Sequence, residues 1–167
     1  MSRLAAALAT CLAIFLASPV ARAAEATPEA IVRDIYAAYG PESWPEDPAG
    51  DHFSADLLAR YIAVEEAAAA NEEPGVGFDV FINAQDIDSV TNLTTRVAQQ
   101  GDDRQLVDVT FTAFEQEQVM RYTFVATDDG WKIDNIAWGE EGANLRALLD
   151  EVMAMQADGG FGDDGVE

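Results

Sequence analysis

Cysteine is almost absent from this sequence. Cys11 is the only one among 167 residues, and it lies in an N-terminal segment that we expect to be removed. A chain without cysteine has neither disulfides nor thiolate ligands for a structural metal ion. The folded protein therefore has to rely on its hydrophobic core for stability.

Basic residues are also scarce. The chain has 9 Lys and Arg against 31 Asp and Glu, which gives a formal net charge of −22. Nucleic acids are bound through clustered Lys and Arg that neutralise phosphates, and anionic membrane surfaces need the same residues, so the composition argues against both partners. We interpret the acidity as a source of solubility, with attraction of a basic partner as the alternative.

Histidine occurs once, as His52. Its ordinary pKa of about 6.5 makes it the obvious general-base candidate. However, it lies beside Phe53, just before the helix that Ser54 is predicted to start, so we expect it to pack at that junction. With one histidine and no cysteine, a zinc site would have to take its other ligands from carboxylates, which is unusual. A hydrolase triad would have only this histidine as its base. We predict no metal ion and no cofactor.

Only one long apolar run is present, from Leu4 to Ala17. It is shorter than the roughly 20 residues of a membrane-spanning helix. Arg3 precedes it, and the small-x-small sequence of residues 21–23 (ARA) follows it, which is the order of a cleavable signal peptide. We therefore predict that residues 1–23 are a signal peptide and that the protein is exported, with the periplasm as the expected compartment. Lipid attachment at Cys11 is the alternative.

The mature chain is predicted to be a single domain. Removing 23 of the 167 residues leaves 144, with 7 Lys and Arg, all 31 acids and a formal charge of −24. We expect the domain to cover residues 24–156 and a disordered, acidic, glycine-rich tail to cover residues 157–167. Residues 159–164 (GGFGDD) match one calcium-binding repeat, but a single copy has no neighbour to stack on.

Amphipathic helices are predicted at both ends of the domain. Thr27 and Pro28 suit the start of the first helix, which Gly40 ends. Residues 41–51 are proline-rich and are predicted to form a loop. Ser54 is predicted to start a second helix, which Pro74 ends. The predicted apolar stripes are Ile31, Ile35 and Tyr39 in the first helix, Leu57, Leu58, Tyr61 and Ile62 in the second, and Leu145, Leu148, Leu149, Val152 and Met153 in the last.

Four strands are predicted between the second and the last helix. Apolar and polar residues alternate over residues 90–98, 106–114, 119–127 and 131–138. Short turn sequences such as residues 128–130 (DDG) join them, which is typical of an antiparallel meander. Helices followed by such a sheet indicate an α+β domain with helices on one face of the sheet.

The chain resembles a bacterial family of exported proteins, domain of unknown function 3828, within the nuclear transport factor 2-like superfamily. The resemblance rests on residues 30–36 (AIVRDIY), 53–58 (FSADLL), 84–86 (AQD) and 130–136 (GWKIDNI), and it extends over about residues 27–150. It implies a cone-shaped fold in which N-terminal helices pack on a curved antiparallel sheet. The family has no established activity, and the superfamily contains small-molecule binders, isomerases, dehydratases and protein-association modules.

Asp86 is the weak catalytic candidate that this resemblance suggests. Enzymes of the superfamily place an acid, His or Tyr in the apolar cone, where burial shifts its pKa. Asp86 follows an apolar stretch and precedes the sheet. As a general base, with Tyr122 as a polarising donor, it would serve an isomerase or lyase acting on an apolar small molecule. An Asp that only caps a turn is the structural alternative.

Six aromatic residues are candidates for lining a ligand pocket, although their spacing also fits a core. They are Tyr36, Tyr39, Trp44, Tyr122, Trp131 and Trp138. No convergent catalytic set accompanies them. The leading hypothesis is therefore a non-catalytic module of the cell envelope that binds a small apolar ligand or another protein through the open face of its sheet. A structural homodimer formed through the sheet is a further alternative.

Overall fold

A computed structural model describes residues 26–41, 43–86, 89–139 and 142–157. Its helices and strands are α1 (Pro28–Ala37), α2 (Pro48–His52), α3 (Ala55–Asn71), β1 (Thr91–Gln99), β2 (Arg104–Ala113), β3 (Gln116–Thr127), β4 (Gly130–Trp138), β5 (Ala143–Asn144) and α4 (Leu145–Ala157). The predicted signal peptide, Cys11 and residues 158–167 of the predicted tail lie outside the described residues. The α+β class is confirmed.

The five strands form one antiparallel sheet in the order β1-β2-β3-β4-β5. The four predicted strands are present, and the two-residue β5 was not predicted. The β2–β3 connection is shorter than expected, because only Phe114 and Glu115 separate the strands. Both have positive φ, 51° and 59°, as a two-residue hairpin turn with matching twist requires. Neither Phe nor Glu is typical of such a turn, so the sequence did not predict it.

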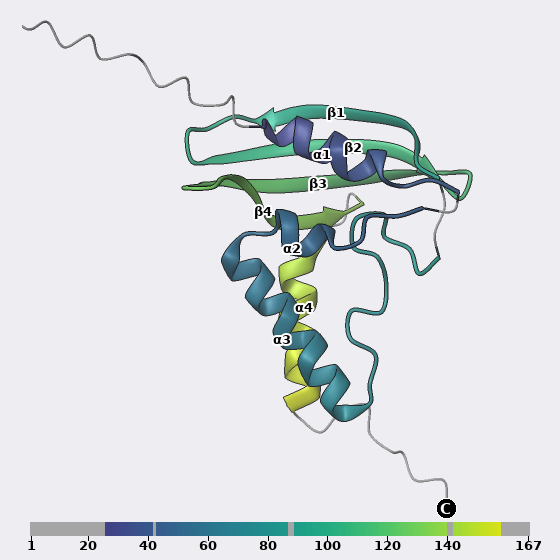
Figure 1. The fold of residues 1–167 in the computed structure, drawn as a ribbon, viewed down its shortest axis with the longest axis vertical. Helices are drawn as coiled ribbons and strands as arrows, with labels where there is room; N and C mark the ends of the chain where they lie inside the picture. Colours follow the sequence, from purple (N-terminus) through teal and green to yellow (C-terminus); the bar gives the residue numbers. More distant parts are fainter. Residues whose placement is uncertain (1–25, 42, 87–88, 140–141, 158–167) are drawn as a thin grey trace, which may run out of the picture.

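The helices leave one face of the sheet uncovered (Figure 1). α1 crosses over β1 and β2, whereas α3 and α4 pack against each other beside β4 and extend beyond the sheet. Antiparallel sheets commonly have one solvated face, on which polar residues alternate with buried ones. The solvated face of this sheet is therefore available as a surface.

The predicted helix starts are confirmed by their capping bonds. Thr27 Oγ1 accepts a hydrogen bond from the Ala30 amide at 3.2 Å, and Ser54 Oγ accepts one from the Leu57 amide at 3.2 Å. Such bonds satisfy amides that have no partner within the helix.

The interpretation of residues 41–51 as a loop throughout is wrong. Asp47 caps the short helix α2, its Oδ1 accepting from the Gly50 amide at 2.9 Å, and Pro48 occupies the first helical position. His52 ends this helix and is half-buried, and burial lowers its pKa. Pro48 therefore begins a helix within a segment whose prolines predicted a loop.

The core lies between the helices and one face of the sheet. Its members on β2 and β3 alternate along each strand and include Val107, Val109, Phe111, Met120, Tyr122 and Phe124, and β4 adds Ile133, Ile136 and Trp138. The predicted stripe of α3 is only partly correct, because Leu57 is buried but Ile62 is 45% exposed. Val64 and Ala68 are buried in its place. A helix that packs mainly on one other helix buries a narrow stripe, which leaves Ile62 outside.

Candidate functional site

Two predicted pocket tyrosines form a buried hydroxyl pair. The Tyr36 and Tyr122 hydroxyl oxygens are 2.8 Å apart, and Tyr36 also donates to the Phe81 carbonyl at 2.6 Å. Each hydroxyl has one proton, so both bonds form when Tyr122 donates to Tyr36. Burial raises the pKa of both tyrosines well above the ordinary value, and the two hydroxyls therefore stay protonated.

Tyr39 extends this buried group of tyrosines. Its hydroxyl donates to Asp79 Oδ2 at 2.7 Å, and Asp79 Oδ1 accepts from the Phe81 amide at 2.8 Å. Burial, followed by the bond to Asp79, raises the pKa of Tyr39. Hydrogen bonds from Tyr36 and Tyr39 thus hold the segment that contains Phe81 in place.

Residues 80–82 occupy the interior against which these tyrosines lie. Val80, Phe81 and Ile82 are all buried. Trp138 Nε1 donates to the Val80 carbonyl at 2.9 Å, as Tyr36 does to the next carbonyl along. Donors that could have faced a ligand are therefore satisfied by the protein's own backbone.

The remaining predicted site residues lie at or near the surface. Trp131 is half-buried against the core, Trp44 is exposed, and Asp86 is exposed. The division of the six aromatic residues between interior and surface was not predicted from the sequence. Three tyrosines and Trp138 meet around residues 79–82, whereas Trp44 is solvated. An exposed carboxylate also lacks the apolar surroundings that the isomerase or lyase alternative requires of Asp86.

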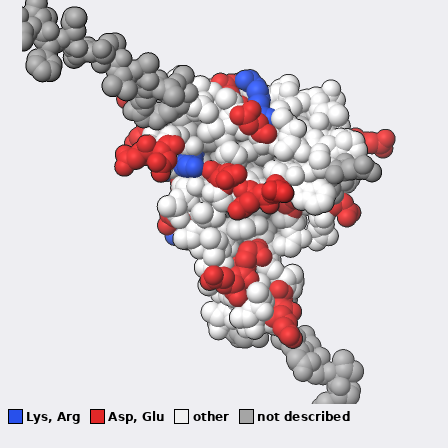
Figure 2. Space-filling view, in the orientation of Figure 1, with Lys and Arg blue, Asp and Glu red and all other residues white. Residues whose placement is uncertain are grey.

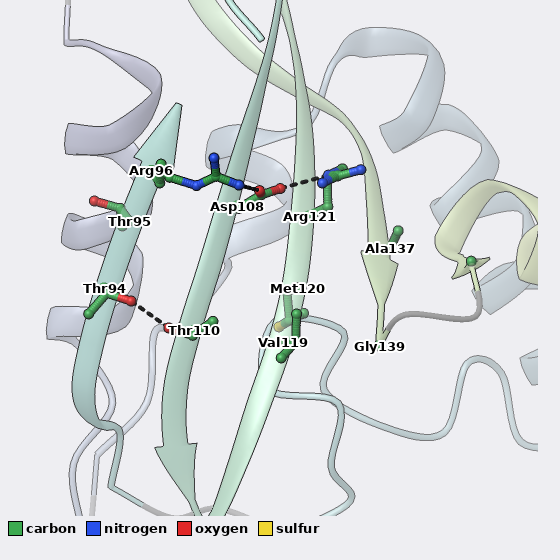
Figure 3. A pocket seen from close by; sticks show the side chains of 11 residues that line it. Thr94, Thr95, Arg96, Asp108, Thr110, Val119, Met120, Arg121, Ala137 and Gly139 are labelled. Carbon is green, nitrogen blue, oxygen red and sulfur yellow. Dashed lines mark hydrogen bonds and ion pairs between the residues drawn. The ribbon is translucent and has the colours of Figure 1, made fainter. Parts of the chain in front are cut away.

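The open face of the sheet carries a groove of about 660 Å³ (Figure 3). It crosses four strands and continues to two glycines after β4. Its lining residues are Thr94, Thr95, Arg96, Asp108, Thr110, Val119, Met120, Arg121, Ala137, Gly139 and Gly142. Side chains of Thr94 and Thr110 hydrogen-bond across β1 and β2. The groove thus combines threonine and charged side chains with an apolar lining to which Val119, Met120 and Ala137 contribute.

Three charged side chains form a row across this groove. Arg96, Asp108 and Arg121 are direct cross-strand partners on β1, β2 and β3. Arg96 Nη2 lies 2.5 Å from Asp108 Oδ2, and Arg121 Nε lies 2.7 Å from Asp108 Oδ1 (Figure 3). The arginine side chains are 75% and 54% exposed, whereas that of Asp108 is 19% exposed. The row therefore presents two accessible guanidinium groups.

The electrostatics of this row favour its charged state. The hydrogen bond from Arg121, supported by Arg96, holds the pKa of Asp108 below its ordinary value. Asp108 in turn raises the pKa of Arg121. Two positive charges and one negative charge leave a net charge of +1 at the centre of the groove. This contrasts with the formal charge of −22 of the whole chain.

This row of charged side chains was not predicted from the sequence. The strand alternation that places Val107 and Val109 inward places Asp108 on the open face, so its position on this face could have been predicted. Its two arginine partners could not, because pairing depends on the register of three strands.

Among residues 26–41, 43–86, 89–139 and 142–157, no group of three or more His, Cys, Asp or Glu side chains is arranged to hold a metal ion. Of the helices in the described part, none is long and apolar enough to cross a membrane.

Comparisons with known proteins show a shared fold and no family. No family model and no curated protein matches the chain. A chain of the type VI effector-immunity complex Tae3-Tai3 from Ralstonia pickettii matches with a TM-score of 0.51 and 20% identity, over 71% of this chain and 100% of that chain. A phospholipid-binding protein from Ralstonia solanacearum, solved with a phospholipid, matches with a TM-score of 0.40 and 13% identity, over 64% and 56%. The chain is an α+β protein with an open antiparallel sheet.

Proposed function

We propose that the chain is an exported, non-catalytic binding module that binds another protein through the open face of its sheet. The groove on this face would receive a segment that carries a carboxylate. The row formed by Arg96, Asp108 and Arg121 is the observation that carries this proposal. Three expectations from the sequence stay predictions. They are the resemblance to domain of unknown function 3828, the cone-shaped nuclear transport factor 2-like fold and the periplasmic location.

The filled interior favours binding at the surface. A small apolar ligand bound beside Tyr36 and Trp138 would need the space that residues 80–82 occupy, and it would displace two hydrogen bonds to their carbonyls. Ligand pockets are concave and mostly apolar, with polar groups free to orient the ligand. Tyr36 and Trp138 do not have such free groups, so we favour a protein over a small apolar molecule.

The exposed arginines favour a carboxylate as the contacted group. Arg96 uses Nη2 and Arg121 uses Nε for Asp108, and no partner from the described residues bonds the other guanidinium nitrogens. Guanidinium groups bind carboxylates through paired, charge-assisted hydrogen bonds. Asp108 holds the two groups in place, so less side-chain entropy is lost on binding.

Affinity capture with matched variants tests this proposal. The mature protein, the double variant Arg96→Gln/Arg121→Gln and the control Arg60→Gln would be used to capture proteins from extracts of the organism that encodes it. Arg60 also pairs with two acids, Asp56 and Asp150, but on the helices. Purified captured proteins would then be titrated by calorimetry.

We expect the groove variant to bind a captured protein at least tenfold more weakly than the control does, because each lost charged contact costs about 1.5–3 kcal/mol. Equal affinity of the two variants would contradict the proposal. Capture of no protein by the wild type would also contradict it.

Formation of a homodimer through the sheet is the competing use of this face. Light scattering on the mature protein distinguishes the two. A monomer leaves the face free for another protein, whereas a dimer that the double variant dissociates would replace our proposal.

A further inference from the structure

A second hollow lies between α2 and α3. It has a volume of about 450 Å³, and its apolar wall comes from Leu58, Tyr61, Ile62 and Ala69 of α3 and from Ala49 of α2. We call it the α2–α3 groove. Residues 58, 62 and 69 lie on one stripe of α3 at helical spacing. This stripe is separate from the one that α3 buries through Leu57, Val64 and Ala68.

The apolar wall is accessible to solvent. Ile62 is 45% exposed, and Leu58 and Tyr61 are only partly buried. Single exposed apolar residues are ordinary, but an exposed apolar stripe within a hollow marks an interaction site in many proteins. The stripe therefore offers a place for an apolar side chain of a partner.

The rim of the α2–α3 groove is acidic. Asp47, Glu65 and Glu66 line it, and no Lys or Arg does so. A smaller hollow of about 250 Å³ adjoins it, shares Asp47, Ala49 and Tyr61, and adds Glu46 and Asp79. Figure 2 shows acidic side chains spread over the face that carries α1 and α3, with few basic ones. The field at this groove is therefore negative.

The possible occupants of the α2–α3 groove differ in charge, and only some of them complement its acidic rim. Residues 158–167 of the chain contain Phe161 but also four acids and no Lys or Arg, so the rim would repel them. A second copy of the chain would bring the same acidic rim and would also be repelled. An occupant with Lys or Arg beside an apolar side chain complements both the wall and the rim.

We propose that the α2–α3 groove binds a cationic, amphipathic segment of a partner protein. An aliphatic or aromatic side chain of that segment contacts Ile62 and Leu58, and its Lys or Arg residues pair with Glu66 and the neighbouring acids. This surface is separate from the groove of the open sheet face and prefers the opposite charge.

A defined peptide tests this proposal. The probe is a 14-residue amphipathic helix of Leu and Lys, titrated into the mature protein by calorimetry, and a Leu and Glu peptide of the same pattern is the charge control. Ile62→Gln removes the apolar anchor point, and Val119→Gln is the matched control because Val119 is 39% exposed on the open sheet face. Glu66→Gln is matched by Glu117→Gln on β3.

We expect Ile62→Gln and Glu66→Gln each to weaken binding of the Leu and Lys peptide at least threefold, while the matched controls leave it unchanged. Added salt should weaken binding, and the Leu and Glu peptide should not bind. Arg96→Gln/Arg121→Gln should have no effect, which separates this test from that of the proposed function.

Equal binding by Ile62→Gln and Val119→Gln would overturn the proposal, because it would show general attraction of cations to an acidic protein. Tighter binding after deletion of residues 158–167 would identify the chain's own tail as the occupant. A dimer that Ile62→Gln dissociates would identify a second copy. Either result would also overturn the proposal.

Discussion

The hydroxyl groups of Tyr36 and Tyr122 have unequal roles although they bond to each other. Tyr36 connects Tyr122 to the Phe81 carbonyl, whereas Tyr122 bonds only to Tyr36 among the described residues. Loss of a buried partner costs most where it leaves a polar group unsatisfied. The Phe81 carbonyl is such a group, since it lies in a buried segment.

Tyr36→Phe should therefore destabilise the protein more than Tyr122→Phe. We expect a loss of about 1 kcal/mol for Tyr122→Phe and about 1–3 kcal/mol for Tyr36→Phe. Urea unfolding of the two variants measures the difference. Equal losses would contradict the inferred direction of these hydrogen bonds.

Asp108 should make stability depend on pH. Its pKa is lowered in the folded state from an ordinary value of 3.8, so its stabilising effect is present above that value and is lost as pH falls through the folded-state pKa. Its partners are exposed, which limits the effect to about 1 kcal/mol.

Asp108→Asn should accordingly be less stable than the wild type at pH 7, and the difference should shrink as pH falls below about 4 and disappear below the folded-state pKa of Asp108. Thermal unfolding across this range is the measurement. A difference that persists unchanged to low pH would show that the carboxylate charge does not stabilise the sheet.

Ser54 joins elements as well as capping one. Its hydroxyl accepts from the Leu57 amide and donates to Asp134 Oδ1 of β4 at 2.9 Å. Arg146 of α4 contacts the same carboxylate oxygen at 2.6 Å, and its Nη1 contacts Asp56 of α3 at 2.6 Å. Together these bonds connect α3, β4 and α4.

Ser54→Ala should cost about 1–2 kcal/mol, whereas Thr27→Ala, which removes an exposed cap alone, should cost about 0.5–1 kcal/mol. Ser54→Asp keeps a capping oxygen but places it against Asp134, so it should not restore stability. Full stability of Ser54→Asp would show that capping alone explains the role of Ser54.

Local sequence signals predicted most elements but not all of them. Thr27 and Ser54 act within a few residues of their own position, so their caps could be predicted. The turn at Phe114 and Glu115 could not, because the pairing of β2 with β3 imposes positive φ on residues that rarely adopt it alone. The exposure of Ile62 was missed because periodicity does not tell which stripe of a helix meets a neighbour.

At the scale of the whole molecule, composition predicted the acidic surface but not its distribution. The net charge of −22 gives no sign that Arg96 and Arg121 meet on one face. Likewise, aromatic residues in the sequence suggested a pocket, but residues 80–82 fill the space beside Tyr36 and Trp138. Both features depend on contacts between distant segments, which spacing along the chain does not reveal.

The central claim is that the open sheet face binds another protein, and photo-crosslinking in cells tests it most directly. A benzophenone amino acid would replace Val119 in the groove and, as a control, the similarly exposed Met153 of α4. We predict a discrete crosslink to a different protein at position 119, absent at position 153 and lost with Arg96→Gln/Arg121→Gln. No crosslink at position 119, or one that the double variant retains, would contradict the claim.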